Sequence, residues 1–435
     1  MRVSSRRWRR RDLSSSFPRN KQSTALLAVG SNTCAAVVTV KFEPRPDFIR
    51  SMLVLFALGF RPFFLLSGLF AILSVALWVP TFAGWLPLNS YYGQIGWHSH
   101  EMIFGYTAAV IAGFLLTAVR NWTEIATAQG WTLAGLTIIW CLGRILPFLS
   151  AVLPPVVIAL VDLSFLPVLV VGIAVPLVQR GERRNLLFLP LIAALWLANL
   201  LVHLALIGFA VNFGDRAVLL GLDSIILLIV IMGGRVIPFF TERAIQGTRI
   251  KRWSAVEWLA TGSVLAFVLA EFLFIDPRVA GLFAGVAAIS NGLRLCGWHT
   301  HRLWRVPLLW VLHLGYGWIV AGFLLKAGAA LALIPAQFTL HAFSVGGIGV
   351  LTLGMMARVS LGHTARPLKV GTEMAIAFAA INFAAVSRGL LPIFYPQWFF
   401  EFVILGGVLW VAAFTIFTIV YVPILTRPRL DGQFG

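Results

Sequence analysis

Charged residues are scarce in this sequence of 435 residues. They make up 11% of the chain, whereas soluble domains contain about 25%. Hydrophobic residues make up 59%, and apolar runs of about twenty residues recur, the length that crosses a hydrocarbon core of roughly 30 Å. The composition therefore excludes a soluble multidomain protein and predicts an all-α, polytopic integral membrane bundle.

Cysteine is also rare, and the motifs of several enzyme classes are missing. The three cysteines, Cys34, Cys141 and Cys296, are scattered and form no CxxC pair, which argues against a disulfide framework or a zinc knuckle. The absence of CxxCH excludes covalent c-type haem attachment. The sequence has no Gly-rich phosphate loop, paired catalytic carboxylates or HExxH, so hydrolase and nucleotide chemistry have no visible residues.

The first 51 residues differ from the rest of the chain. They contain eleven basic residues and three acidic ones, and no clean cleavage site follows their one apolar stretch. We expect residues 1–51 to be a disordered cytoplasmic extension, or translated upstream sequence with Met52 as the true start. Residues 52–435 then form the membrane domain.

Twelve apolar segments are predicted to span the membrane from residue 62 onward. Their predicted limits are 62–82, 98–119, 131–149, 155–178, 186–209, 217–240, 254–274, 279–298, 307–327, 337–357, 371–392 and 398–424. Connections on one side carry fifteen Lys and Arg residues, and those on the other carry three. Because positive residues concentrate in cytoplasmic loops, both chain termini are predicted to be cytoplasmic.

Seven ionisable residues fall inside the predicted spans. Charged groups are costly in lipid, so these side chains are expected to face the bundle interior or the headgroups. They mark either a functional site or structural salt bridges. The seven are Arg144, Asp162, Asp223, Arg235, Glu271, Arg294 and Arg388.

Histidines provide the most informative candidates for a site. The predicted topology places four of the eight near the outer membrane surface: His98, His100, His203 and His341. With a rise of about 1.5 Å per residue, they fall at similar depths. We therefore expect these four imidazoles to share a site.

One internal correspondence suggests what that site binds. The second span reads His100-x4-Gly105-x7-Gly113, and the tenth reads His341-x4-Gly346-x7-Gly354. Neutral imidazole is the usual protein ligand of haem iron, and glycine permits close approach of a flat ring. The pattern predicts b-type haem bound by His100 and His341, with Gly105 and Gly346 beneath it. The alternatives are helix-packing glycines and a polar histidine network.

Copper is the second metal that these side chains suit, because imidazole and thioether groups both bind it. Met102 lies one turn from His98, and His203 would complete an outer copper site. His313 is kept as a candidate metal ligand, although it lies too deep on the cytoplasmic side to join the outer group. A simple hydrogen bond to a neighbouring helix is its alternative role.

Several long motifs resemble the NnrS family. The resemblance implies a twelve-span protein of the bacterial cytoplasmic (inner) membrane, associated with haem, copper and nitric oxide stress or denitrification. It covers about residues 56–427 and implies functional roles for His98, His100, His203, His313, His341, His363, Arg235, Arg294 and Arg358. The motifs are FALGFRPFFLLSGLFA (56–71), WHSHEMIFGYTAAVIAGFLLTAVRNWT (97–123), GGRVIPFFTERA (233–244), NGLRLCGW (291–298), LHLGYGWIVAGFLL (312–325) and HAFSVGGIGVLTLGMMARVSLGHTARPL (341–368).

Two other functions are alternatives to this one. A nitric oxide reductase or oxidase of the haem–copper type would need an adjacent His-His pair on the seventh span and His-x-His on the tenth, and both are absent. A transporter of a metal, haem or a small anion suits twelve spans with intramembrane charges. The expected partners are membrane lipid and nitric oxide as a small ligand, with no nucleic acid. The electron donor, and the choice between turnover of nitric oxide and protection from it, are left open.

Overall fold

Long helices account for most of the chain in the computed structural model, which describes residues 54–273 and 276–435. The predicted extension 1–51 and the proposed start at Met52 lie outside the described residues. In the described part the helices are α2 Phe60–Phe82, α3 Gln94–His100, η1 Glu101–Thr107, α4 Ala108–Thr123, α5 Trp131–Ile145, α6 Pro155–Arg180, α7 Phe188–Leu206, α8 Gly214–Ala244, α9 Ser254–Phe272, α10 Pro277–Trp298, α11 Pro307–Ala330, η7 Ala342–Gly349, α12 Val350–His363, α13 Thr372–Gly389, α14 Leu391–Phe394 and α15 Phe399–Thr426.

Twelve segments of the described chain are long and apolar enough to span a membrane, which confirms the predicted number. The second span joins α3, η1 and α4, and the tenth contains η7 and α12. The largest discrepancy at the end of a span is in the tenth, predicted to end at residue 357 and observed to end at His363. Arg358 is 4% exposed and Ser360 is fully buried. The helix therefore continues inside the protein beyond its apolar run.

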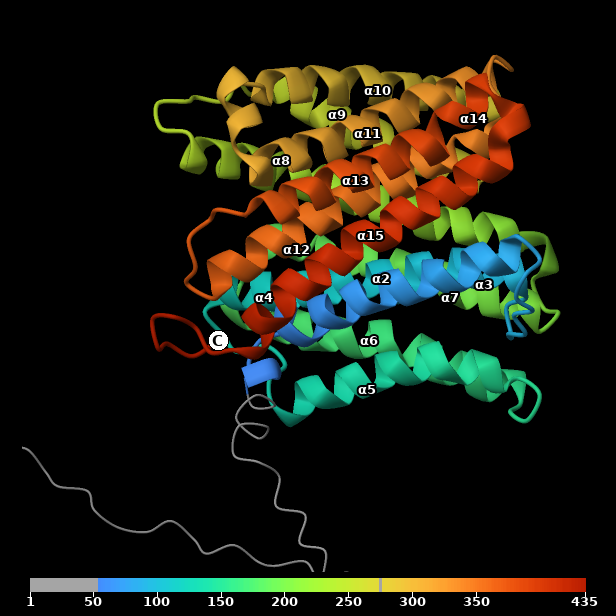
Figure 1. Cartoon of the computed structure of the whole chain (residues 1–435), viewed down its shortest axis with the longest axis horizontal. Coiled ribbons are helices and arrows are strands. Elements are labelled where there is room, and N and C mark those ends of the chain that lie inside the picture. The colour runs from blue at the N-terminus through green and yellow to red at the C-terminus, as the bar shows by residue number, and fades with distance from the viewer. Residues whose placement is uncertain (1–53, 274–275) are drawn as a thin grey trace, which may run out of the picture. The chain divides into compact units, whose positions relative to one another are not determined.

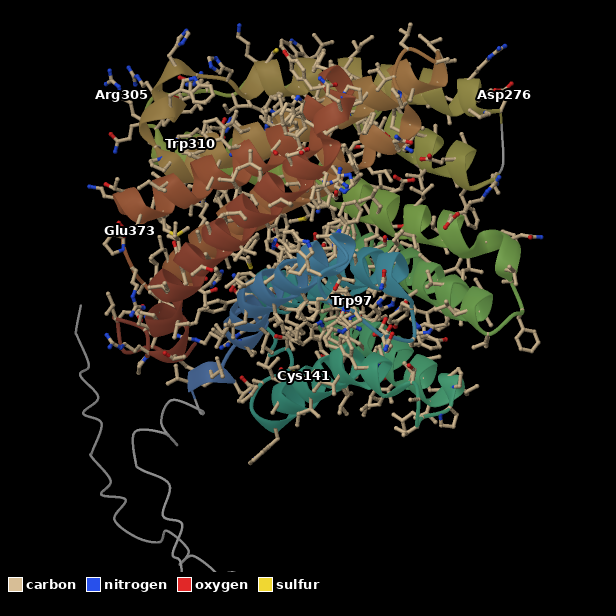
Figure 2. The ribbon with its side chains drawn as sticks, turned by 45° about the vertical axis from the view of Figure 1, so that its right-hand side comes forward. Trp97, Cys141, Asp276, Arg305, Trp310 and Glu373 are labelled. Carbon is tan, nitrogen blue, oxygen red and sulfur yellow. The ribbon has the colours of Figure 1, made fainter. Side chains whose placement is uncertain are left out.

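The beginning of the first span lies beside the end of the last. The Arg61 guanidinium on α2 donates hydrogen bonds to the carbonyl oxygens of Leu425, at 2.7 Å, and Arg427, at 2.9 Å. An even number of spans requires this shared side. Figure 2 shows Asp276 and Arg305, which flank α10, at opposite ends of the helices. The cytoplasmic location of the termini remains a prediction.

The helices form a layered bundle in which the second and sixth spans are the most enclosed. In Figure 1, α10 and α5 lie at opposite edges, with α2, α12 and α15 between them. In its most apolar stretch the second span is 89% buried and the sixth 83%, whereas the seventh is only 33% buried. Large apolar side chains cover the outer surface, as a lipid environment requires. They include Leu160, Ile289, Phe383 and Ile419.

Two π-helices interrupt the histidine-bearing spans at matching positions. The segment η1 begins directly after His100, and η7 begins directly after His341. A π-helix is rare and occurs mostly as a single turn at functional sites. The hydroxyl of Thr107 donates to the carbonyl of Met102 at 2.7 Å, five residues earlier. The repeated His-x4-Gly-x7-Gly pattern therefore extends to the backbone conformation.

Candidate metal centre

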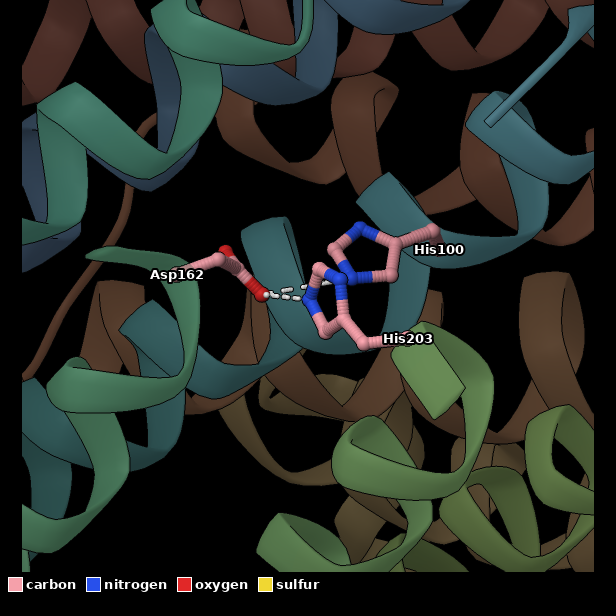
Figure 3. Close-up of side chains that lie close together, drawn as sticks. All are labelled: His100, Asp162 and His203. Carbon is pink, nitrogen blue, oxygen red and sulfur yellow. Dashed lines mark hydrogen bonds and ion pairs between the residues drawn. The ribbon is translucent and has the colours of Figure 1, made fainter. Parts of the chain in front are cut away.

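Three buried side chains from three spans converge near one end of the bundle. His100 lies at the end of α3, Asp162 on α6 and His203 on α7, and none is more than 4% exposed. One nitrogen from each imidazole and one carboxylate oxygen all lie within 4.8 Å of one another. Figure 3 shows both imidazoles facing the Asp162 carboxylate. Among the described residues, this is the group of three that could hold a metal ion.

His100 has oxygen acceptors at both ring nitrogens. Its Nδ1 lies 3.1 Å from Glu101 Oε1, and its Nε2 lies 2.9 Å from Asn199 Oδ1 and 3.4 Å from Asp162 Oδ2. The Asn199 amide orientation follows from its Nδ2, which donates to Asp162 Oδ2 at 2.7 Å. A neutral imidazole has only one N–H. In neutral His100 the other ring nitrogen would therefore carry no proton and would face oxygen atoms that can only accept a hydrogen bond. A second proton or a metal ion resolves this conflict.

The carboxylates around His100 are held by one arginine. Arg144, at the end of α5, pairs with Glu101 at 2.8 Å and with Asp162. Ionised Glu101 and Asp162 carry two negative charges against one positive charge. With neutral imidazoles the cluster has a net charge of about −1, which is unfavourable within a membrane. The charge balance therefore calls for one more bound cation, either a proton or a metal.

Two tyrosines from the connection that precedes α3 contact the histidines of the cluster. The Tyr92 ring stacks on His100 with centroids 3.9 Å apart, and the Tyr91 hydroxyl lies 3.4 Å from His203 Nδ1. Burial, followed by the charge of Asp162, raises the pKa of Tyr91 to about 12. The same causes raise the pKa of Tyr92 well above its usual value. Both phenols are therefore neutral near pH 7.

The ligand set of the cluster matches several transition metals. Two imidazoles and one carboxylate suit zinc, iron(II) or copper(II), and the latter two are redox-active. A metal-bound histidine commonly donates its other ring N–H to a carboxylate, and His100 Nδ1 faces Glu101 in that way. The thioether predicted for an outer copper site is not here, because Met102 lines a different cavity.

That second site lies on the other side of α3. His98 and His341 both line a cavity of about 160 Å³, together with Trp78, Met102 and Arg388. The Trp78 ring stacks on His98 with centroids 4.0 Å apart. Within the described residues, the Nδ1 atoms of His98 and His341 are buried without hydrogen-bond partners. The two histidines therefore border one cavity, and each has a ring nitrogen without a protein partner among the described residues.

The predicted pairs of histidines are thus divided differently in the structure. His100 lies with His203, whereas His98 lies with His341. Residues two apart in an α-helix point about 200° apart, so His98 and His100 face opposite sides of their span. The structure does not bring His100 and His341 into one cavity. It also does not bring His98 to His203.

Neighbouring protein side chains cover both predicted haem-contacting glycines. A Cβ atom at Gly105 would lie 2.6 Å from Arg144 Nη1 and 2.7 Å from Glu101 Oε2. At Gly346 it would lie 2.5 Å from the Trp318 ring. Each glycine therefore permits close packing of neighbouring side chains. This matches the alternative given in the sequence analysis, that the glycines serve helix packing.

The remaining candidate residues lie away from these two sites. His313 Nδ1 donates to Leu309 O on its own helix at 2.9 Å. His363 Nε2 lies 3.4 Å from Asn121 Nδ2. The intramembrane arginines Arg235, Arg294 and Arg358 contact respectively the Asn185 amide oxygen, the Glu257 carboxylate and the Phe240 ring.

Sequence reasoning did not assign six members of the cluster to the site: Tyr91, Tyr92, Glu101, Arg144, Asp162 and Asn199. Arg144 and Asp162 stood out as ionisable residues inside spans, which was the available signal. Asp162 on α6 and His203 on α7 belong to consecutive antiparallel spans. Comparing their depths would have placed them together.

The fold and this cluster define a multi-pass α-helical membrane protein with a buried histidine–carboxylate centre. The model of the NnrS protein family matches residues 54–429, and the chain therefore belongs to the NnrS family. Membership fits, in general terms, a protein of the nitric oxide response. A search of curated proteins finds no match to this sequence.

Proposed function

We propose that this chain is a haem- and copper-binding protein of the bacterial inner membrane that contributes to the nitric oxide response or to nitric oxide metabolism in denitrification. The observation that carries the proposal is the pair of histidine sites on opposite faces of the second span. Membership of the NnrS family supports the link to nitric oxide.

The metal ion is assigned to His100, His203 and Asp162. Their donor atoms lie within 4.8 Å of one another, and the charge of the cluster calls for a cation. When bound, copper would supply a redox-active ion that coordinates nitric oxide. Arg144 neutralises part of the carboxylate charge, Asn199 orients Asp162, and the stacked Tyr92 ring shields His100 from water.

Haem is assigned to the cavity between His98 and His341, in place of the His100–His341 pair expected from the sequence. The donors fit, because the two spans that face each other each present an imidazole with an unpartnered Nδ1. The volume of about 160 Å³ is close to that of a cavity that holds benzene, about 150 Å³. Haem is much larger than benzene, so it would fit only if the lining side chains moved apart. The haem assignment therefore rests on the donors alone. When bound, haem would supply an iron that binds nitric oxide.

The proposal is tested on the purified full-length protein by metal analysis and optical spectroscopy. Copper, iron and zinc are quantified per chain, and spectra are recorded oxidised, reduced with dithionite, and after addition of nitric oxide. His100→Ala and His203→Ala are expected to lose copper and keep the Soret band. His98→Ala and His341→Ala are expected to lose the Soret band and keep copper. His301→Ala, which removes an exposed histidine elsewhere, serves as the control.

Each other outcome changes the proposal in a defined way. Loss of haem in His100→Ala but not in His98→Ala would restore the pairing predicted from the sequence. Zinc in place of copper would exclude redox chemistry at the metal centre. A wild-type protein that stays colourless and metal-free after reconstitution with hemin and copper would overturn the proposal and favour transport.

A further inference from the structure

Arg388 occupies an unusual position in the cavity between His98 and His341. It lies one residue before the end of α13 and lines this cavity from the side of the eleventh span. Its guanidinium carbon lies 5.0 Å from the centroid of the Phe399 ring. The other nitrogen-bearing side chains that line the cavity are the imidazoles of His98 and His341 and two tryptophan indoles, and no acidic side chain lines it. The cavity therefore contains a fixed positive charge.

No acidic side chain of the described residues forms an ion pair with Arg388. This separates it from Arg144, which pairs with two carboxylates, and from Arg294, which pairs with Glu257. Arg388 is partly buried, and within a membrane an enclosed charge normally has a partner, because its transfer from water is costly. The cavity therefore combines a cation and two unpartnered imidazole nitrogens without a protein anion.

We propose that Arg388 binds an anionic group of the ligand that fills this cavity, a carboxylate or a small oxyanion. Guanidinium groups bind carboxylates and oxyanions through paired N–H donors in a planar fork. Two sources supply this chemistry, a haem propionate and a free nitrogen oxyanion such as nitrite. The haem source rests on the proposed function, whereas the free anion does not. The volume of about 160 Å³ accommodates a small anion directly.

The inference is tested with Arg388→Gln and Arg388→Lys in the full-length protein. Arg278→Gln is the matched control, because it removes an exposed arginine outside the cavity. For the haem source, the dissociation constant for hemin and the midpoint potential are measured. For the free anion, sodium nitrite is titrated by calorimetry into haem-free and haem-loaded protein at constant ionic strength, with chloride as the reference anion.

If the anion is a propionate, Arg388→Gln weakens hemin binding by about ten- to a hundredfold, the usual effect of one charge-assisted hydrogen bond. Its midpoint potential also shifts, and Arg388→Lys recovers part of the affinity. If the anion is free, nitrite binds the wild-type protein and binds Arg388→Gln at least tenfold more weakly. In both cases Arg278→Gln matches the wild type.

Failure of this inference is distinguishable from failure of the proposed function. A protein that binds hemin equally well with and without Arg388, and does not bind nitrite, overturns the inference and leaves the haem assignment intact. Arg388 would then extend to the lipid headgroups, as arginines near helix ends often do. A protein that takes up no hemin but binds nitrite through Arg388 overturns the haem assignment and supports the inference.

Discussion

The two sides of α3 place their histidines in opposite environments. On one side, His100 contacts Glu101, Asn199 and Asp162, so both of its nitrogens face oxygen atoms. On the other side, His98 contacts an aromatic ring and a cavity, and its Nδ1 has no partner among the described residues. One histidine is surrounded by polar protein groups, whereas the other borders an aromatic ring and a cavity.

This difference shows that one helix can serve two sites without sharing ligands between them. A separation of two residues turns side chains by about 200°, so His98 and His100 have almost no common neighbours. Their depth in the membrane is nevertheless nearly the same. Substitutions on the two sides should therefore have separable effects.

The largest expected effect belongs to the His100 side. Arg144→Met removes the partner of both Glu101 and Asp162 and leaves two buried carboxylates uncompensated. Breaking a buried ion pair from one side lowers the free energy of unfolding by about 3–5 kcal/mol. Thermal unfolding in detergent, followed by fluorescence-detected size exclusion, measures the loss. Arg278→Met, at an exposed position, should change it by less than about 0.5 kcal/mol. Equal melting of the two variants would mean that the carboxylates are not ionised.

In the span that carries His341, Gly346→Ala should destabilise the packing of the tenth span against the ninth. Its Cβ would lie 2.5 Å from the Trp318 ring, which cannot move without disturbing its hydrogen bond to Asn382. Overpacking of this kind costs about 1–3 kcal/mol. Gly262→Ala in α9 meets no atom within 4 Å and serves as the control. The same unfolding assay applies, and a neutral Gly346→Ala would show that Trp318 is not rigid.

Asn199→Ala sharpens the comparison by acting on the metal centre alone. Asn199 donates to Asp162 and accepts near His100, but it is not among the three candidate ligands. Removing such a supporting group lowers metal affinity by about ten- to a hundredfold. Competition with a chromophoric copper chelator measures it. A simultaneous change in the Soret band would contradict the separation of the two sites.

The smallest effect is expected at Tyr91. Its pKa is raised to about 12 by burial and by the charge of Asp162, so it is protonated in the folded state where an unfolded tyrosine has begun to ionise. Its contribution to stability is therefore present below about pH 10 and is lost as the pH rises towards 12. In Tyr91→Phe the absorbance change at 295 nm near pH 12 should be smaller than in the wild type. A decrease in the absorbance change near pH 10, and none near pH 12, would instead place the phenol in water.

The fold was predictable from the sequence to a greater degree than the site. Apolar length sets the number of spans, because each must cross the same hydrocarbon core. The second and tenth spans were predicted to end too early, because buried polar residues such as Arg358 continue these helices. Hydropathy does not detect a helix end that is enclosed by protein.

The depth of the histidines was predicted, but their direction was not. Depth changes by about 1.5 Å per residue, whereas direction changes by about 100°, so a small error in helix phase exchanges one face for another. The π-helix η1 adds a further change of phase within the second span. The sequence therefore could not show whether His98 or His100 faces His341, and the structure was needed to decide.

The π-helices also make it possible to change the direction in which the histidines of the second and tenth spans point. Removing one residue from η1 would rotate α3 against α4 by about 100° while leaving most of the apolar span in place. Each single-residue insertion or deletion at Glu101–Thr107 or Ala342–Gly349 would thus rotate the adjoining segment by a fixed angle. Related proteins could re-aim their histidines through chain length at these two points, without replacing any of them.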